Sequence, residues 1–197
     1  MDAKPMKEVV KKLAQILFGD YSAYKIYSRS KADASPSHPT TTATFRIEPV
    51  DEFAINSSAE PLIREQVGYA GPGSHAYACF DDGRIVGICF YWFGDRYLRR
   101  NFWPLVDGEA KLVQIISLPE MRGRGIATML ITLSCRHMMQ TGFRQLYARI
   151  WHSNTPSLRA FERAGWMQVA FVLEINPLRQ IQPIRIRLNF KSPFMRT

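Results

Sequence analysis

The residues of this chain that are best suited to chemistry form a short glycine turn. Arg122, Gly123, Arg124 and Gly125 follow an apolar run that ends at Pro119, and residues with helical spacing follow them at once. The first N–H groups of a helix have no intrahelical acceptor and carry a partial positive charge. Glycine also lets the backbone approach a ligand closely. The turn therefore favours an anion such as phosphate, although tight packing alone also explains glycine at such a turn.

Two common nucleotide-binding patterns are absent from this turn. A P-loop requires GxxxxGK[ST], and the sequence contains no such stretch. A dinucleotide fingerprint requires GxGxxG, but Thr128 occupies the place of its third glycine. Neither a P-loop nor a dinucleotide site is predicted.

The elements that must position the turn follow from hydrophobic periodicity. Residues 112–117 form a nearly continuous apolar run, which is typical of a central strand. An Asp-Gly pair between two apolar runs predicts a hairpin. Further strands are expected at 45–50, 75–80, 85–93, 146–151, 166–175 and 182–190, and helices at 57–69, at 126–140 and between Asn154 and Gly165. The order of these elements predicts an α/β fold with a mixed sheet and helices on its faces.

The first 44 residues differ in composition from the rest. Apolar residues among the first 18 have helical spacing and are interrupted by lysines, which predicts an amphipathic helix. Residues 21–27 are aromatic and suit a strand, and 31–44 form a polar linker. We expect residues 1–44 to be an accessory segment and residues 45–197 to be the main domain.

The net charge of +9 is concentrated in the C-terminal part. Residues 1–120 hold 14 basic and 15 acidic side chains, whereas residues 121–197 hold 12 basic and two acidic ones. We therefore expect the C-terminal part to meet an anion. The basic residues are dispersed without a recognised nucleic-acid motif, so no nucleic-acid partner is expected.

Three cysteines, Cys79, Cys89 and Cys135, are too sparse for a disulfide framework and lack metal-ligand spacing. They indicate reduced thiols and a cytoplasmic location, and no metal is expected. No stretch reaches the ~20 apolar residues of a membrane-spanning helix, so no membrane span is expected.

Two motifs resemble those of the GNAT acetyltransferase superfamily. The first is [QR]xxGx[GA], and the second is an Asn-started helix that ends in a Gly-aromatic pair. The matching residues are Arg122, Gly125 and Ala127, then Asn154, Phe161, Gly165 and Trp166. The resemblance extends from about Cys79 to Glu174. It implies a GNAT-like acyl-CoA N-acyltransferase fold, in which the strands at 112–117 and 146–151 splay apart.

The resemblance also implies acetyl-CoA, or another acyl-CoA, as co-substrate. Its pyrophosphate is expected on the turn and the following helix, at Arg122, Gly123, Arg124, Gly125, Ile126, Ala127 and Thr128. Pantetheine is expected between the splayed strands, near Asn154 and Ser157. Backbone groups of Ile115, Ile116 and Ser117 are expected to line it and to meet the oxyanion.

The chemistry that the resemblance implies is direct attack of an amine on the thioester, without a covalent nucleophile. The family often places a tyrosine in the helix after the Asn to protonate the thiolate, but this chain has Phe161 there. Tyr147 is the expected substitute, with Tyr91 as the alternative. Glu109 is the expected base, acting through water, with His152 as the alternative.

The stretch from 91 to 103 is aromatic and basic, and we expect it to form a wall of the acceptor site. It suits an acceptor with a ring-shaped body and an anionic group. The leading prediction is therefore an N-acetyltransferase that acts on a small amine. The alternative is a catalytically weak GNAT-fold protein that binds acyl-CoA. Residues 1–44 then serve as a lid, a docking element or a homodimer contact.

Overall fold

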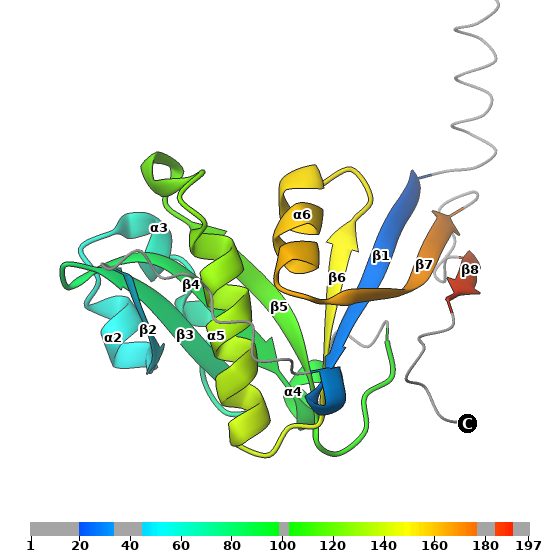
Figure 1. The fold of residues 1–197 in the computed structure, drawn as a ribbon, viewed down its shortest axis with the longest axis horizontal. Coiled ribbons are helices and arrows are strands. Elements are labelled where there is room, and N and C mark those ends of the chain that lie inside the picture. Colours follow the sequence, from blue (N-terminus) through cyan, green and yellow to red (C-terminus); the bar gives the residue numbers. More distant parts are fainter. Residues whose placement is uncertain (1–19, 34–44, 99–102, 177–183, 191–197) are drawn as a thin grey trace, which may run out of the picture.

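The computed structural model describes residues 20–33, 45–98, 103–176 and 184–190. In these residues a single sheet has the strand order β2-β3-β4-β5-β6-β1-β7-β8 (Figure 1). The strands are β1 (Asp20–Ser30), β2 (Phe45–Val50), β3 (Ser74–Asp81), β4 (Arg84–Trp92), β5 (Glu109–Ser117), β6 (Gln145–Trp151), β7 (Met167–Asn176) and β8 (Ile184–Asn189). Within this described sheet β5 and β6 are parallel, and the other neighbours are antiparallel. The predicted α/β fold with a mixed sheet is confirmed.

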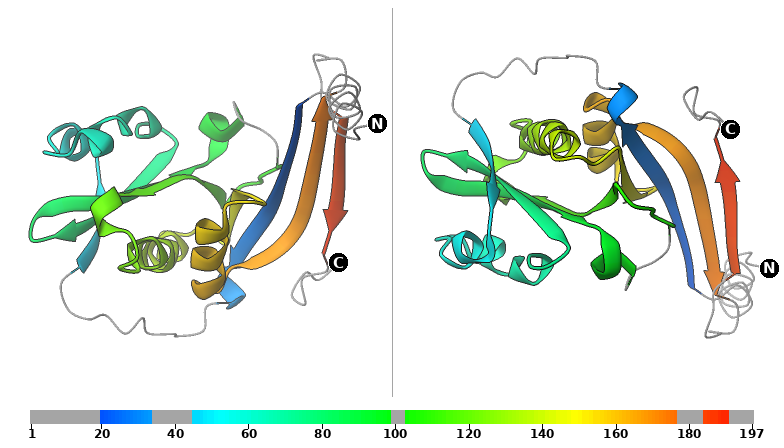
Figure 2. Two further views of the ribbon diagram at one scale, coloured as in Figure 1. Left: turned by 90° about the horizontal axis from the view of Figure 1, so that it is seen from above. Right: turned by 90° about the horizontal axis from the view of Figure 1, so that it is seen from below.

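Helices cover both faces of the sheet. The described α-helices are α2 (Glu52–Asn56), α3 (Pro61–Arg64), α4 (Gly94–Leu98), α5 (Ile126–Gln140) and α6 (Thr155–Arg163). Figure 2 shows α5 and α6 on one face, which we call the α5 face, and α2, α3 and α4 on the other, the α2 face. None of the helices in the described ranges is long and apolar enough to cross a membrane.

Helix α5, in the crossover from β5 to β6, packs on the sheet and contributes to the main hydrophobic core. Leu130, Ile131 and Met138 of α5 are buried, and they lie on one side of the helix as the apolar periodicity predicts. Gly87 of β4 lets α5 come close to the sheet. A Cβ at this position would lie 2.9 Å from Cγ2 of Ile126 and 3.1 Å from Cδ1 of Leu130.

The expected accessory segment contributes an internal strand. The predicted strand at 21–27 is present within β1, which pairs with β6 on one side and with β7 on the other. Residues 20–30 therefore belong to the body of the sheet. The amphipathic helix expected within residues 1–18 and most of the expected linker lie outside the described residues.

The predicted helix at 57–69 is wrong. α2 ends before this segment begins, and the segment itself forms only α3 and a 3-10 turn at Val67–Tyr69. Asp51 caps α2 by accepting the N–H of Ala54 at 2.8 Å. Pro61 has no N–H to donate, so it stands at the start of α3 and a helix cannot run through it. The predicted hairpin is confirmed as β3–β4, with Asp82 and Gly83 at positive φ in its turn.

Candidate functional site

Two parallel strands separate in the middle of the sheet. β5 and β6 pair from Glu109 with Gln145 to Leu112 with Ala148, and no described pair follows. Beyond this point the strands diverge toward the starts of α5 and α6 (Figure 1). We call residues 113–117 and 149–151 of these strands the splay. The splayed central strands that the resemblance implies are confirmed.

A β-bulge in β5 coincides with the start of the splay. Phe90 of β4 faces Gln114, while Tyr91 faces Leu112, so Val113 is an extra residue in β5. A bulge bends its strand and increases the local twist. Because Val113 directly follows the last residue that pairs with β6, the bulge gives a physical reason for the divergence of the two strands.

The pairing of β5 with β4 decides which backbone groups face the splay. The N–H of Leu118 donates to the carbonyl of Val86 at 2.9 Å, and bonded pairs alternate along an antiparallel ladder. Ile116 therefore directs its backbone groups to β4. Ile115 and Ser117 direct their N–H and C=O groups toward β6 and the splay. Of the three backbone positions expected to contact pantetheine, Ile115 and Ser117 have the orientation needed, and Ile116 does not.

The glycine turn lies at the end of β5, beside the splay. Gly123 and Gly125 have φ values of +78° and +80°, a left-handed conformation, and nothing lies within 4 Å of a Cβ built on either. Gly125 is the N-cap of α5 and offers no side-chain cap. The N–H groups that follow this uncapped start belong to Ile126, Ala127 and Thr128. The turn therefore has the backbone geometry of an anion site.

The charge around the turn is positive. The side chains of Arg122 and Arg124 are exposed. Glu120 is the acidic residue nearest to the turn in the sequence, and its carboxylate forms an ion pair with Arg84 at 2.7 Å. Hydrogen bonds from the backbone and from Arg84 hold the pKa of the Glu120 carboxyl below its usual value. Because Arg84 compensates this carboxylate, the two arginines of the turn are left to attract an anion.

Asn154 begins α6 on the β6 side of the splay. Its side-chain oxygen accepts the N–H of Ser157 at 3.3 Å, so Asn154 caps the helix. Phe161, in the same helix, is 2% exposed and packs edge-on against Trp166 with ring centroids 5.0 Å apart. The position at which the family often has a tyrosine is therefore a core position in this chain.

The two expected catalytic side chains lie at the paired ends of β5 and β6, before the splay. The carboxylate of Glu109 accepts the N–H of Val106 at 3.1 Å. Tyr147 pairs in register with Lys111, and its ring lies 5.6 Å from that of Trp103. Burial and the negative charge of Glu109 raise the pKa of Tyr147. The two side chains are therefore electrostatic neighbours, displaced along the strands from the glycine turn.

Sequence reasoning missed two polar side chains beside the splay. Lys111 is 2% exposed, and its amino group lies 5.5 Å from the ring centroid of Tyr97. On the α2 face, Nε2 of Gln114 donates to Oε1 of Gln66 at 2.9 Å. The sequence alone could have indicated both residues, because Lys111 borders an otherwise apolar central strand and Gln114 interrupts it.

The stretch expected to form the acceptor wall divides between the two faces. The hydroxyl of Tyr91 lies 2.9 Å from that of Ser134 on α5, and burial raises the pKa of Tyr91. Tyr91 is therefore a core residue of the α5 face. The hydroxyl of Tyr97 donates to the carbonyl of Trp103 at 2.7 Å. Residues 99–102 of the expected wall lie outside the described residues.

Two further candidates have structural partners. Nδ1 of His152, at the end of β6, lies 3.0 Å from the carbonyl oxygen of Ala23. Cys135 of α5 is buried, and burial raises the pKa of its thiol to about 12. In the part of the chain that the structure describes, no group of three or more His, Cys, Asp or Glu side chains is arranged to hold a metal ion.

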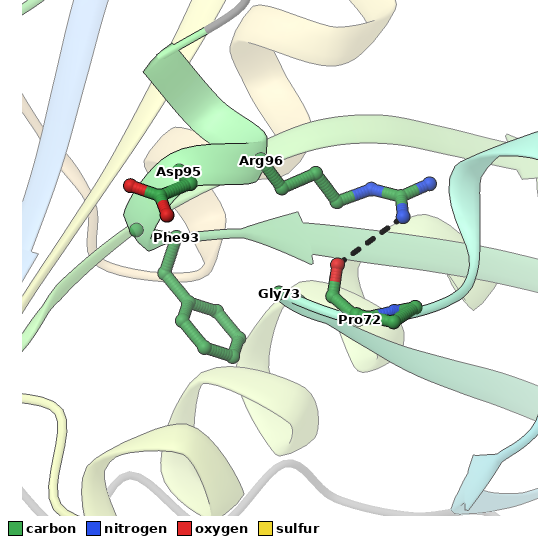
Figure 3. Close-up of a pocket in the computed structure, with 6 residues that line it drawn as sticks. Pro72, Gly73, Phe93, Asp95 and Arg96 are labelled. Carbon is green, nitrogen blue, oxygen red and sulfur yellow. Dashed lines mark hydrogen bonds between the residues drawn. The ribbon is translucent and has the colours of Figure 1, made fainter.

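A pocket of about 580 Å³ lies between the start of β3 and the end of β4 (Figure 3). In its wall, Arg96 of α4 donates to the carbonyl of Pro72 at 3.2 Å. Trp92, just before this pocket, pairs with Lys111 at the beginning of β5. The pocket is therefore at the opposite end of β5 from the glycine turn and does not coincide with the splay.

Comparisons with known proteins agree with this geometry. Residues 39–166 match the model of the Acetyltransferase (GNAT) family. The chain is also similar to the mycothiol acetyltransferase of Corynebacterium efficiens, with 26% identity over 84 residues that cover 42% of this chain and 28% of that protein.

Solved structures share the fold at low identity. A putative GNAT-family acetyltransferase from Novosphingobium aromaticivorans is 18% identical with a TM-score of 0.52, over 80% of this chain and 64% of that one. A tandem GNAT protein from the clavulanic acid biosynthesis pathway is 14% identical with a TM-score of 0.54, over 89% and 59% of the two chains. The chain thus spans less than two thirds of the length of each of these relatives. Because the family model covers more than half of the residues and the sheet splays as that fold requires, the chain belongs to the GNAT family of acetyltransferases.

Proposed function

We propose that this chain is an acyl-CoA-dependent N-acetyltransferase that transfers the acetyl group of acetyl-CoA to the amine of a small molecule. One observation carries the proposal: the splay begins at the bulge of Val113 and ends beside an uncapped, positively charged helix start at Gly125. An extended pantetheine arm and a pyrophosphate require these two features next to each other.

The backbone groups on the β5 wall of the splay support a coenzyme site there. Ile115 and Ser117 orient their N–H and C=O groups toward β6, so an extended amide chain can add to β5 as a strand does. The pyrophosphate then meets the N–H groups at the start of α5 and the guanidinium groups of Arg122 and Arg124. Asn154 and Ser157 border the other wall of the splay.

The reaction is a direct displacement. The amine nitrogen attacks the thioester carbonyl carbon, an N–C bond forms, and the C–S bond breaks as the sulfur leaves. One proton passes from the amine nitrogen to water or a base, and the thiolate takes up a proton. A backbone N–H of β5 aimed at the oxyanion stabilises the transition state by roughly 3 kcal/mol. Holding amine and thioester side by side supplies a further entropic advantage.

Glu109 and Tyr147 are proposed to handle protons from a distance. Glu109 precedes Val113 by four residues, which corresponds to about 13 Å along a strand, so it can act on the amine only through water. Tyr147 lies two residues closer to the splay than Gln145, the residue of β6 that faces Glu109. A phenol is already protonated at neutral pH, as a donor to the thiolate must be, and burial raises the pKa of Tyr147 further.

We also propose that the enzyme works in the cytoplasm. Cys79, Cys89 and Cys135 are free and buried. Unpaired buried thiols are typical of proteins that work in a reducing compartment. Their burial also supports a reaction without a cysteine nucleophile, since burial raises the thiol pKa of Cys89 to about 12.

Calorimetry with acetyl-CoA tests the coenzyme site. We expect binding by the parent chain and a loss of at least about tenfold in affinity for Arg122→Ala and Gly125→Glu. Arg136→Ala is the matched control, because Arg136 is an exposed arginine near the other end of α5. No binding by the parent chain, or equal affinity in all variants, contradicts the proposal.

A second candidate function is acyl-CoA binding without turnover. The observation that favours it is Phe161, a buried ring without a hydroxyl at the family's frequent tyrosine position. Release of free thiol from acetyl-CoA, followed with a panel of primary amines, separates the two functions. Amine-dependent release supports the transferase, and binding without release supports the second candidate.

A further inference from the structure

On the α2 face, two arginines of the C-terminal half are stacked on aromatic rings. The guanidinium carbon of Arg149 lies 4.0 Å from the ring centroid of Tyr24 and 5.3 Å from that of Trp151. The guanidinium carbon of Arg187 lies 4.6 Å from the ring centroid of Trp103. A cation–π contact of this kind helps to hold a guanidinium in position. The N–H groups of a guanidinium can bind carboxylates and phosphates in a bidentate manner.

The sheet register places these groups on one surface. Tyr24 of β1 pairs with Trp151 of β6 on one side and with Val172 of β7 on the other, and Val172 pairs with Arg187 of β8. Directly paired residues project from the same face of a sheet. Arg149 precedes Trp151 by two residues and so projects from that face as well. We call Tyr24, Trp103, Arg149, Trp151 and Arg187 the arginine surface.

The arginine surface begins where the splay begins. Arg149 directly follows Ala148, the last residue of β6 that pairs with β5. Trp103 connects the two arginines, because its ring lies under Arg187 and 5.6 Å from the ring of Tyr147, two residues before Arg149. The surface therefore adjoins the place where the thioester is proposed to lie, on the face of the sheet opposite α5 and α6.

Glu174 lies next to the arginine surface, and its carboxylate already has hydrogen-bond partners. Glu174 accepts hydrogen bonds from the hydroxyl of Tyr24 at 2.9 Å, from the hydroxyl of Ser22 at 3.0 Å and from Nε of Arg185 at 2.7 Å. Its charge is therefore compensated by Arg185. In the ranges that the structure describes, Arg187 forms no ion pair. The surface accordingly has positive charge to offer to an external anion.

We propose that the arginine surface binds an anionic group of the acceptor, so that the preferred acceptor is a primary amine that also carries a carboxylate or a phosphate. The inference rests on the proposed function, because it takes acetyl transfer at the splay as given. Arg149 and Arg187 recognise the anion, and the exposed ring of Trp151 contacts the body of the acceptor. Trp103, which is buried, supports Arg187 from below. The surface also accounts for part of the C-terminal basic excess that the coenzyme does not explain.

The test compares acceptors that differ only in the anion. Tyrosine is paired with tyrosinamide, and glucosamine 6-phosphate with glucosamine, at saturating acetyl-CoA. We expect kcat/KM to favour the anionic member of at least one pair by about tenfold or more. Arg149→Met and Arg187→Met should each reduce this preference by about tenfold. The pair that responds identifies carboxylate or phosphate as the recognised group.

Arg46→Met is the matched control. Arg46 lies on β2 at the far edge of the sheet, where it forms an exposed ion pair with Glu48 at 3.3 Å. This control should leave the preference unchanged. Circular dichroism and thermal unfolding establish that each variant is folded before rates are compared. Raising the salt concentration should also reduce the preference, since Arg187 is exposed to solvent.

The outcomes separate this inference from the proposed function. If calorimetry detects no binding of acetyl-CoA, the proposed function fails and the inference fails with it. If acetyl-CoA binds and neutral amines react, but both members of each pair react alike or no anionic amine reacts, the inference alone is overturned. If acetyl-CoA binds and no amine of either kind reacts, the proposed transferase fails together with the inference. If Arg149→Met and Arg187→Met weaken acetyl-CoA binding without changing the preference, the arginines serve the coenzyme and the inference is also overturned.

Discussion

Lys111 of β5 and Tyr147 of β6 are cross-strand partners one register before the two strands separate. The side chain of Lys111 is 2% exposed, and its amino group lies over the ring of Tyr97. A buried lysine and a tyrosine with a raised pKa are therefore direct cross-strand neighbours at the base of the splay. The proposed function gives Tyr147 the role of proton donor.

Replacement of Lys111 by methionine should destabilise the fold less than replacement by alanine. A methionine fills nearly the same space and keeps the packing contacts of the lysine stem. Lys111→Ala should instead lower the free energy of unfolding by about 2 to 4 kcal/mol, because it leaves a cavity. Urea unfolding of both variants checks this. If methionine destabilises as much as alanine, the ammonium group itself stabilises the fold and the prediction is wrong.

Two glycines with the same conformation allow the anion site to be tested separately from backbone strain. Gly125 and Gly83 both have φ of +80°, and nothing lies within 4 Å of a Cβ built on either. Alanine at each should lower the free energy of unfolding by about 1 to 2 kcal/mol. Only Gly125→Ala should also weaken acetyl-CoA binding, by about tenfold, because it shifts the N–H groups at the start of α5.

Titration calorimetry of acetyl-CoA binding to the Gly125→Ala and Gly83→Ala variants tests this prediction. Gly83 lies in the β3–β4 turn, so Gly83→Ala reports strain alone. Equal acetyl-CoA affinity in the two variants means that the glycine turn does not hold the pyrophosphate.

Proline substitutions test the assigned backbone directions in β5. Ile115→Pro removes an N–H that faces the splay, whereas Ile116→Pro removes one that bonds to β4 and leaves a buried carbonyl without its donor. Ile116→Pro should therefore be the less stable variant by about 1 to 3 kcal/mol. Ile115→Pro should lose acetyl-CoA binding more than its loss of stability explains. Denaturant unfolding and calorimetry measure the two effects, and the reverse order of stability contradicts the assigned pattern.

Features encoded by neighbouring residues could be predicted from the sequence. The β3–β4 hairpin depends on a turn at Asp82 and Gly83, and the strand, glycine turn and helix from 112 to 140 depend on local periodicity. The cap at Asn154 and the stop at Gly165 are local too. The helix expected at 57–69 failed for a local reason, since Pro61 limits it.

Features that depend on distant pairing could not be predicted. β1 lies between β6 and β7, so its partners are more than a hundred residues away, and no local pattern specifies them. The bulge at Val113 appears only when the register of β5 against β4 is known. That register also determines that the backbone groups of Ile115 and Ser117 face the splay, whereas those of Ile116 face β4. The arginine surface requires four strands in the correct order before Arg149 and Arg187 share a face.

The carboxylate of Glu174 gives a pH dependence with a definite sign. Burial alone would raise the pKa of this carboxyl, but hydrogen bonds from Tyr24, Arg185 and Ser22 outweigh burial and lower the pKa from its usual value of 4.5. A lowered folded-state pKa means that the stabilisation is present above pH 4.5 and is lost as the pH falls through the folded-state pKa. Glu174→Gln should therefore reduce the free energy of unfolding at pH 7 by about 1 to 3 kcal/mol.

The difference between Glu174→Gln and the parent chain should shrink as the pH falls below 4.5, because the unfolded parent takes up a proton first and the folded carboxylate takes one up only at its lowered pKa. Urea unfolding at several pH values between 3 and 7 measures it. Glu48→Gln is the control, because Glu48 pairs with Arg46 at 3.3 Å on the surface, and such exposed pairs contribute about 0 to 1 kcal/mol. A constant difference across this pH range would show that Glu174 acts through its shape and packing, since loss of an ionised group must follow its titration.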